Sequence, residues 1–162
     1  MRKQLIIVLF VALLSITYGF ETSPTAASLG DKAPEFTVTD NQHSFTLQHD
    51  QSRYTLVAFW SSQDAESRTL AAKYSRWYDN SNKNNIRYAA INLDSDNSLY
   101  NEILRQDNLP LETQYFGGSE VLKNLQNAYG ISDRLGAILI DPTGTIIEVN
   151  PSQDTLESII RS

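Results

Sequence analysis

The sequence predicts an α/β sandwich in which helices flank a mixed central sheet. Short, nearly unbroken apolar runs at Tyr54–Trp60, Ile86–Leu93 and Ala137–Ile140 are typical of strands that are buried on both faces. Between these runs the apolar residues recur at helical spacing, as strand–helix–strand crossovers require. Apolar and polar residues alternate before the first run and again near the end of the chain. This pattern predicts a strand pair at each end of the domain.

An N-terminal β-hairpin precedes the first buried strand. Phe36–Thr39 and Ser44–Leu47 alternate apolar and polar residues around Asp40-Asn41-Gln42, which favours a turn. After the strand Tyr54–Trp60, the apolar residues of Ala65–Tyr78 recur at helical spacing, which predicts a helix. The apolar face of this helix consists of Leu70, Tyr74, Trp77 and Tyr78.

A second crossover follows the strand Ile86–Leu93. Asp96 or Ser98 can cap the helix that begins there, because short polar side chains accept hydrogen bonds from free N–H groups of the first turn. Its apolar residues are Leu99, Ile103 and Leu104. Asn108–Gly118 is expected to be irregular, with the aromatic pair Tyr115-Phe116 packed on the core.

The last third of the chain predicts one more helix and a closing strand pair. Ser119 can cap a helix that places Leu122, Leu125 and Tyr129 inward and stops at Gly130. The elements expected after it are the strand Ala137–Ile140, its antiparallel partner Thr145–Val149, and the helix Thr155–Arg161.

Residues 1–20 match a secretory signal peptide. Arg2 and Lys3 precede the apolar run Leu5–Ile16, and small residues follow it. A membrane anchor is the alternative, but spanning a bilayer takes about 20 apolar residues and this run is shorter. We therefore expect a signal peptide at 1–20, a flexible lead-in at 21–29, one domain at 30–162, and no stable membrane span after cleavage.

The composition excludes several classes of function. The chain has 13 Lys and Arg against 19 Asp and Glu, which disfavours nucleic-acid binding. It has no cysteine, so disulfides, thiolate metal sites and cysteine nucleophiles are excluded, and the sequence predicts neither a metal site nor a cofactor. An exported chain without cysteines or glycosylation sequons favours the periplasm of a Gram-negative bacterium.

Five segments in the right order resemble thioredoxin-fold proteins of the exported TlpA/ResA type, which are related to the AhpC/TSA group. These segments are Gly30-Asp31-Lys32-Ala33-Pro34-Glu35-Phe36-Thr37, Leu56–Trp60 with Ser61-Ser62, Ile91–Asp94, Ala128-Tyr129-Gly130-Ile131, and Leu139-Ile140-Asp141 with Gly144 and Ile146. Together they extend over most of the chain. The resemblance implies a thioredoxin-like three-layer sandwich with an N-terminal β-hairpin.

The resemblance also locates a degenerate active site. When the chain is aligned on Phe59-Trp60, the two cysteines of the family's Cys-x-x-Cys motif fall on Asp64 and Ser67, and its cis-proline falls on Leu135. Disulfide exchange needs a thiolate to attack and a second thiol to resolve the mixed disulfide, and a carboxylate and a hydroxyl can do neither. We expect Asp64 to act as a helix cap instead, and Leu135 to be trans.

The sequence therefore predicts a redox-inactive, thioredoxin-like module of the cell envelope that binds an unidentified protein or peptide. Its binding surface would comprise Ser61, Ser62, Gln63, Glu66, Arg68 and Arg134 around the degenerate positions. One alternative is a thiol-disulfide oxidoreductase or peroxidase-like role, which only the resemblance implies. Another is an acid–base or hydrolytic site at Asp64. Hydrolysis needs a base, and His43 and His49 are expected to be surface residues far from that site.

Overall fold

The computed structural model describes residues 27–40, 43–48, 52–81, 83–130 and 135–161. In chain order its elements are β1 (Phe36–Thr39), β2 (Ser44–Leu47), β3 (Tyr54–Trp60), α1 (Ala65–Asp79), β4 (Ile86–Asn92), α2 (Asn97–Gln106), the 3₁₀ helix η1 (Leu111–Thr113), β5 (Gln114–Phe116), α3 (Gly118–Tyr129), β6 (Gly136–Ile140), β7 (Ile146–Val149) and α4 (Gln153–Ile160). β1 and β2 form the predicted hairpin, and the other strands form one sheet.

The five-stranded sheet has the order β5-β4-β3-β6-β7, so β3 lies at its centre. β3 runs parallel to β4, with Val57 opposite Ala89, and antiparallel to β6, with Val57 opposite Ile138. The sheet is therefore mixed, as predicted. The apolar run of β3 follows from this central position, since both of its faces are covered.

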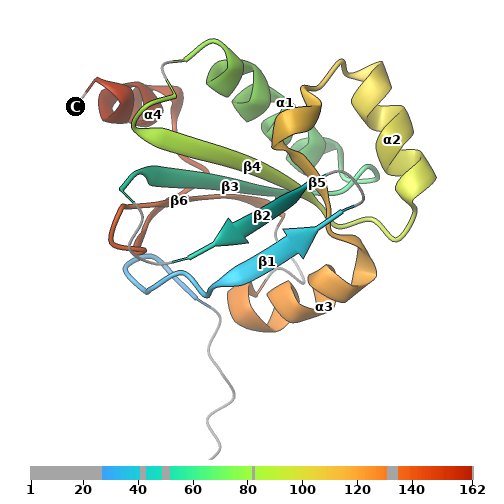
Figure 1. Cartoon of the computed structure of the whole chain (residues 1–162), viewed down its shortest axis with the longest axis horizontal. Helices are drawn as coiled ribbons and strands as arrows, with labels where there is room; N and C mark the ends of the chain where they lie inside the picture. The colour runs from blue at the N-terminus through green and yellow to red at the C-terminus, as the bar shows by residue number, and fades with distance from the viewer. Residues whose placement is uncertain (1–26, 41–42, 49–51, 82, 131–134, 162) are drawn as a thin grey trace, which may run out of the picture.

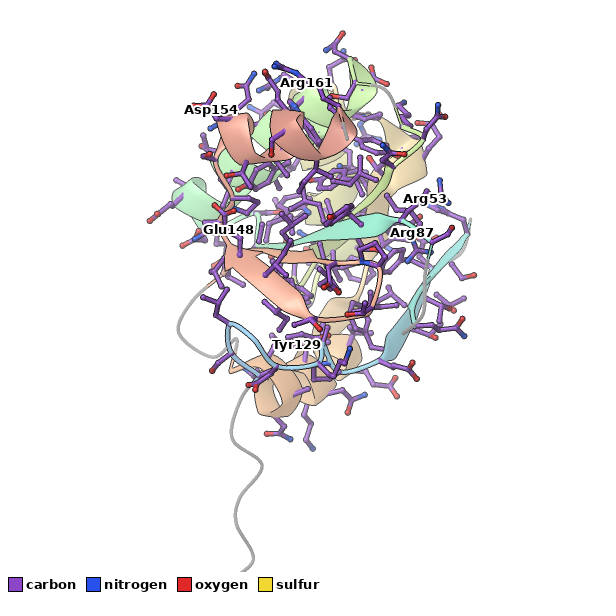
Figure 2. All side chains as sticks on the ribbon, turned by 90° about the vertical axis from the view of Figure 1, so that its left-hand side faces the viewer. Arg53, Arg87, Tyr129, Glu148, Asp154 and Arg161 are labelled. Carbon is purple, nitrogen blue, oxygen red and sulfur yellow. The ribbon has the colours of Figure 1, made fainter. Side chains whose placement is uncertain are left out.

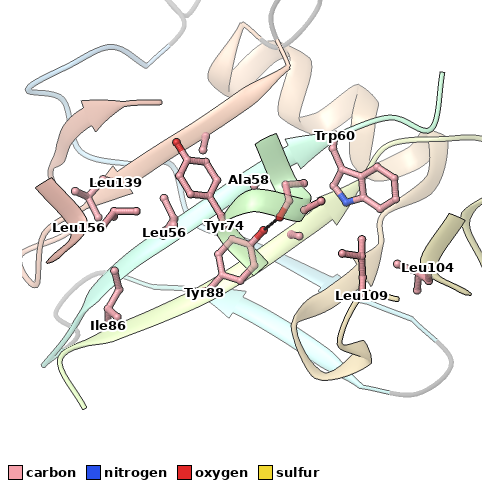
Figure 3. Packing of buried hydrophobic residues seen from close by; sticks show 14 of the residues in the cluster. Leu56, Ala58, Trp60, Tyr74, Ile86, Tyr88, Leu104, Leu109, Leu139 and Leu156 are labelled. Atoms are coloured by element: carbon pink, nitrogen blue, oxygen red, sulfur yellow. Dashed lines mark hydrogen bonds between the residues drawn. The ribbon is translucent and has the colours of Figure 1, made fainter. Parts of the chain in front are cut away.

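Each face of the sheet has its own apolar core. Leu56 and Trp60 of β3 point to one face, and Val57 and Phe59 point to the other, because successive side chains of a strand alternate. The first core includes Tyr74 of α1, Leu104 of α2 and Leu156 of α4 (Figure 3). The second core includes Phe45 of β2, Val38 of β1 and Leu125 of α3. Figure 1 shows the resulting layers, with α1, α2 and α4 above the sheet and the hairpin and α3 below it.

Two parts of the sequence interpretation were wrong in detail. The segment that was expected to be irregular contains β5, a buried strand that pairs with β4 between Ala90 and Asn92. α3 begins at Gly118 rather than after a Ser119 cap. The reason is that Gly117 N–H donates to Asn92 O (2.9 Å), so the pairing of β5 with β4 continues up to the residue directly before the helix.

The helix caps otherwise follow the side-chain chemistry. Asp96, rather than Ser98, caps α2 and accepts from the N–H of Ser98 (2.8 Å). Gly130 ends α3 in the left-handed region with φ 62°, as predicted for a helix-stopping glycine. Ser152 caps α4, so this helix begins two residues earlier than expected. Among the helices that the structure describes, none combines the length and apolar character needed to cross a bilayer.

Candidate functional site

Asp64 lies in the loop between β3 and α1 and caps the helix. Its extended backbone (φ −102°, ψ 103°) lets Oδ1 accept a 2.6 Å hydrogen bond from the N–H of Ser67. Hydrogen bonding from Ser67 lowers the pKa of the Asp64 carboxyl below its usual range. The carboxylate is exposed and already ionised at neutral pH, so it serves as an acceptor and not as a proton donor.

Ser67 is enclosed one turn inside the helix. Only 2% of the residue is exposed. Its hydroxyl donates to Asp64 O (3.2 Å) and accepts from the N–H of Ser61 (3.3 Å). This side chain therefore ties the helix start to the end of β3 and is not presented to a substrate.

Asp94 holds the same loop through hydrogen bonds to Ser61 and Ser62. This carboxylate is only 8% exposed and follows β4 at the end of the sheet where β3 also ends. Oδ1 accepts from Ser61 Oγ–H (2.6 Å), both oxygens accept from Ser62 N–H (3.1 Å), and Oδ2 accepts from Asn92 Nδ2 (3.0 Å). Burial alone would raise the pKa of Asp94, but these hydrogen bonds outweigh it and lower the pKa.

The role of Asp94 was missed by sequence reasoning, which treated it as the end of a matching segment. A signal for it was present. The carboxyl ends of parallel neighbouring strands meet at one edge of a sheet, and polar residues at that edge are usual components of α/β sites. An aspartate two residues after β4 and a Ser-Ser pair directly after β3 satisfy that condition.

Arg68 connects α1 to α2. Its Nε and Nη2 donate to the two carboxylate oxygens of Asp107 at 2.7 and 2.6 Å, a bidentate pair, and Nη2 also donates to Gln106. The Arg68 hydrogen bonds lower the pKa of Asp107. A groove of about 400 Å³ lies beside this pair, with Gln63 and Arg76 among its lining residues.

Leu135 lies directly before β6, and its neighbour Gly136 pairs with Phe59 near the end of β3. The degenerate positions Asp64, Ser67 and Leu135 are therefore gathered at one end of the sheet. Leu135 packs against the core beneath the hairpin. Arg134, the other predicted surface residue here, lies outside the described residues, and so does the peptide bond that joins it to Leu135.

The sequence model described as "AhpC/TSA family" matches residues 29–149. The chain belongs to the AhpC/TSA family. A search of curated proteins finds no match for it.

Solved structures give this AhpC/TSA chain a thioredoxin-like fold. It is similar to a thioredoxin-like protein from Parabacteroides distasonis, with 29% identity, a TM-score of 0.71 and coverage of 85% of this chain and 97% of that one. It is also similar to a thiol:disulfide interchange protein from a Bacteroides species (19% identity, TM-score 0.71, 85% and 93% covered). A third match is a thiol-disulfide oxidoreductase from Bacteroides fragilis (22% identity, TM-score 0.65, 81% and 98% covered).

This AhpC/TSA member has no cysteine, so its own side chains cannot exchange disulfides. The described residues do not assemble a hydrolytic site at Asp64 either. His43 was expected at the surface, but its imidazole is half-buried and packs against Tyr115 in a tilted arrangement, with 4.5 Å between ring centroids. Its Nδ1 lies 3.4 Å from Asp40 Oδ1. His49 lies outside the described residues. Among those described, no histidine hydrogen-bonds to Asp64 or Ser67.

Proposed function

We propose that this AhpC/TSA chain is a redox-inactive, thioredoxin-like module of the cell envelope that binds a protein or peptide at the start of α1. The observation that carries the proposal is the occupation of the two cysteine positions. Asp64 is used as a helix cap, and the Ser67 hydroxyl is used to hold the loop. Both residues have internal structural partners, so the fold of the site is kept without its sulfur chemistry.

A rigid and partly exposed surface supports a binding role. Ser61 and Ser62 are fixed by the buried carboxylate of Asp94. Gln63 and Glu66 are exposed beside them, so they are available to a partner. A surface that is already ordered loses little conformational entropy on association, which favours binding.

Arg68 defines one side of this surface. Because Asp107 and Gln106 already engage its guanidinium, Arg68 fixes the position of α1 relative to α2 rather than offering a free charge. Gln63 and Arg76 remain at the adjacent groove of about 400 Å³ as polar contacts for a partner. This combination favours an extended polar segment of a protein over a small apolar ligand.

Export to the periplasm is part of the same proposal. It rests on residues 1–20, in which a basic start, a short apolar run and small residues follow one another. The domain from residue 30 onward would then function outside the cytoplasm, where a module without cysteines is insensitive to the oxidising conditions.

Site-specific photocrosslinking tests the binding proposal. A photoreactive amino acid at Gln63 should give a discrete adduct with an envelope protein, whereas the same group at the exposed Ser158 of α4 serves as the matched control. An excess of wild-type protein without the photoreactive group should compete for the partner and abolish the Gln63 adduct. Identical adducts at both positions, or none at Gln63, would refute a partner at the start of α1.

A further inference from the structure

A second groove lies at the opposite end of the central strands. It encloses about 640 Å³ and is lined by residues from β2, the end of α1, β4 and the η1–β5 segment. Arg53 precedes the start of β3, whereas Asp64 follows its end, so this groove is separate from the surface discussed above. Its volume is in the range of pockets that hold small ligands.

Two arginines converge on this groove. Arg87 lies on β4, Arg53 directly precedes β3, and both side chains line the groove. Figure 2 shows Arg53 and Arg87 next to each other on one flank of the molecule. The arrangement is unusual for a chain with a net charge of −6, in which cations are scarce.

Arg87 is held in place but not neutralised. Its guanidinium lies over the Phe45 ring, 5.3 Å from the centroid, and Nη2 donates to the carbonyl oxygen of Thr46 (3.4 Å). Its Nε is buried without a hydrogen-bond partner in the described structure. Burial first, and then the nearby charge of Arg53, lower the pKa of Arg87. Among the described residues, no carboxylate forms a salt bridge with Arg87.

Three basic and two acidic side chains line the groove, so the net charge of its lining is positive. Lys83 lines the groove and is already matched by Asp79, with 3.3 Å between Nζ and Oδ1. Glu112 also lines it, but within the described residues it makes no salt bridge with either arginine. The groove therefore has a net positive lining, with Arg87 held in place and Arg53 exposed beside it.

We propose that this groove binds a small organic anion through its carboxylate or phosphate group, with Arg53 and Arg87 as the recognition residues. Guanidinium groups match the planar, multi-oxygen geometry of these anions and form strong charge-assisted hydrogen bonds with them. The rings of Tyr78 and Tyr115 line the groove and provide apolar contact for the body of the ligand. This site is independent of the binding role proposed at the start of α1.

Isothermal titration calorimetry of the full domain with citrate and with inorganic phosphate tests the site, at constant ionic strength set with chloride. One of the two anions should bind saturably, and which one binds identifies a carboxylate or a phosphate ligand. Arg53→Gln should weaken that binding at least tenfold, the loss expected for one charge-assisted hydrogen bond. Lys123→Gln on α3 removes the same charge from an exposed position elsewhere and should leave the affinity unchanged.

The Nε–H resonance of Arg87 in ¹⁵N-labelled wild-type protein gives a second measurement that needs no variant. It should shift with the bound fraction as the anion is added, because an anion in the groove changes the electrostatic environment of the Arg87 guanidinium. Absence of saturable binding by both citrate and phosphate would overturn the proposal. Equal weakening in Arg53→Gln and Lys123→Gln, or an unperturbed Arg87 resonance at saturation, would also overturn it.

Discussion

Asp64 stabilises the start of α1 through the short hydrogen bond that it accepts from Ser67 N–H. Replacing Asp64 with Ala removes the acceptor and the negative charge near the positive end of the helix dipole, so Asp64→Ala should lower the free energy of unfolding by about 1 kcal/mol. Asp64→Asn retains an acceptor and should lose clearly less. Urea denaturation of both variants measures the difference, and an Asp64→Ala protein that is more stable than wild type would contradict the capping role.

Asp94 should make the stability of the domain depend on pH. Because its folded-state pKa is depressed, its stabilising contribution is complete above the unfolded value near 3.9 and is lost as the pH falls through the lower folded value. Ser62 N–H and Asn92 Nδ2 donate to a carboxylate oxygen of Asp94. In Asp94→Asn, an NH₂ group takes the place of one carboxylate oxygen and cannot accept these hydrogen bonds. This variant should be less stable than wild type by about 1–3 kcal/mol at pH 7.

The free energies of unfolding of wild type and Asp94→Asn should depend differently on pH. From pH 7 to pH 3 wild type should lose stability more steeply than Asp94→Asn, so the gap between their free energies of unfolding should narrow. Denaturant titrations at several pH values measure that gap. A gap that stays constant down to pH 3 would show that the Asp94 charge does not hold the Ser61-Ser62 loop.

At the scale of elements, a buried polar chain joins α1, β4 and β5. Gln114 Nε2 donates to Ser75 Oγ (2.8 Å), Ser75 Oγ contacts Tyr88 Oη (3.3 Å), and Tyr88 Oη donates to the carbonyl oxygen of Ala71 (3.0 Å). Ser75 and Gln114 are completely buried. These contacts hold the short strand β5 against a helix on the face above it.

Ser75→Ala should therefore destabilise the domain by about 1–3 kcal/mol, because it leaves a buried Gln114 amide without its acceptor. Combining it with Gln114→Leu removes the stranded donor and should recover part of that loss. Thermal and urea unfolding of Ser75→Ala, Gln114→Leu and the double variant decide the point. If the double variant is less stable by the sum of both single effects, the two side chains are not coupled.

The sequence predicted the elements whose burial is encoded locally. β3 and β4 are continuous apolar runs, and their boundaries were predicted to within one residue. β5 was missed because three residues are too few to show the alternation of a strand, and their burial depends on pairing with β4. Caps such as Asp64 and Gly130 could be predicted because their partners lie within the same turn.

Long-range polar contacts could not be predicted in the same way. Arg68 and Asp107 are 39 residues apart, and Asp94 reaches back 33 residues to Ser61. Only the folded sheet and helices bring these groups together. The half-buried position of His43 has the same origin, since its neighbour Tyr115 belongs to the strand that was missed.

At the scale of the whole molecule, the central claim is that positions 64 and 67 keep the geometry of the family's cysteine pair, while the cysteines and the proline at position 135 are replaced. Asp64 and Ser67 flank the first turn of α1, and residues three apart at a helix start fall within the Cα separation of about 4.4–6.8 Å that a disulfide needs. A thiol at position 64 would also lie at the positive end of the helix dipole, which lowers its pKa and activates it.

Thiol titration of the folded double variant Asp64→Cys, Ser67→Cys after mild oxidation tests this claim most directly. Both thiols should be lost to an intramolecular disulfide. The reduced variant should then accelerate insulin reduction by dithiothreitol, and Leu135→Pro should increase that rate, while wild-type protein stays at the buffer rate. Two thiols that remain free in the folded, oxidised variant would contradict the claim, because positions 64 and 67 would then not occupy the place of the cysteine pair.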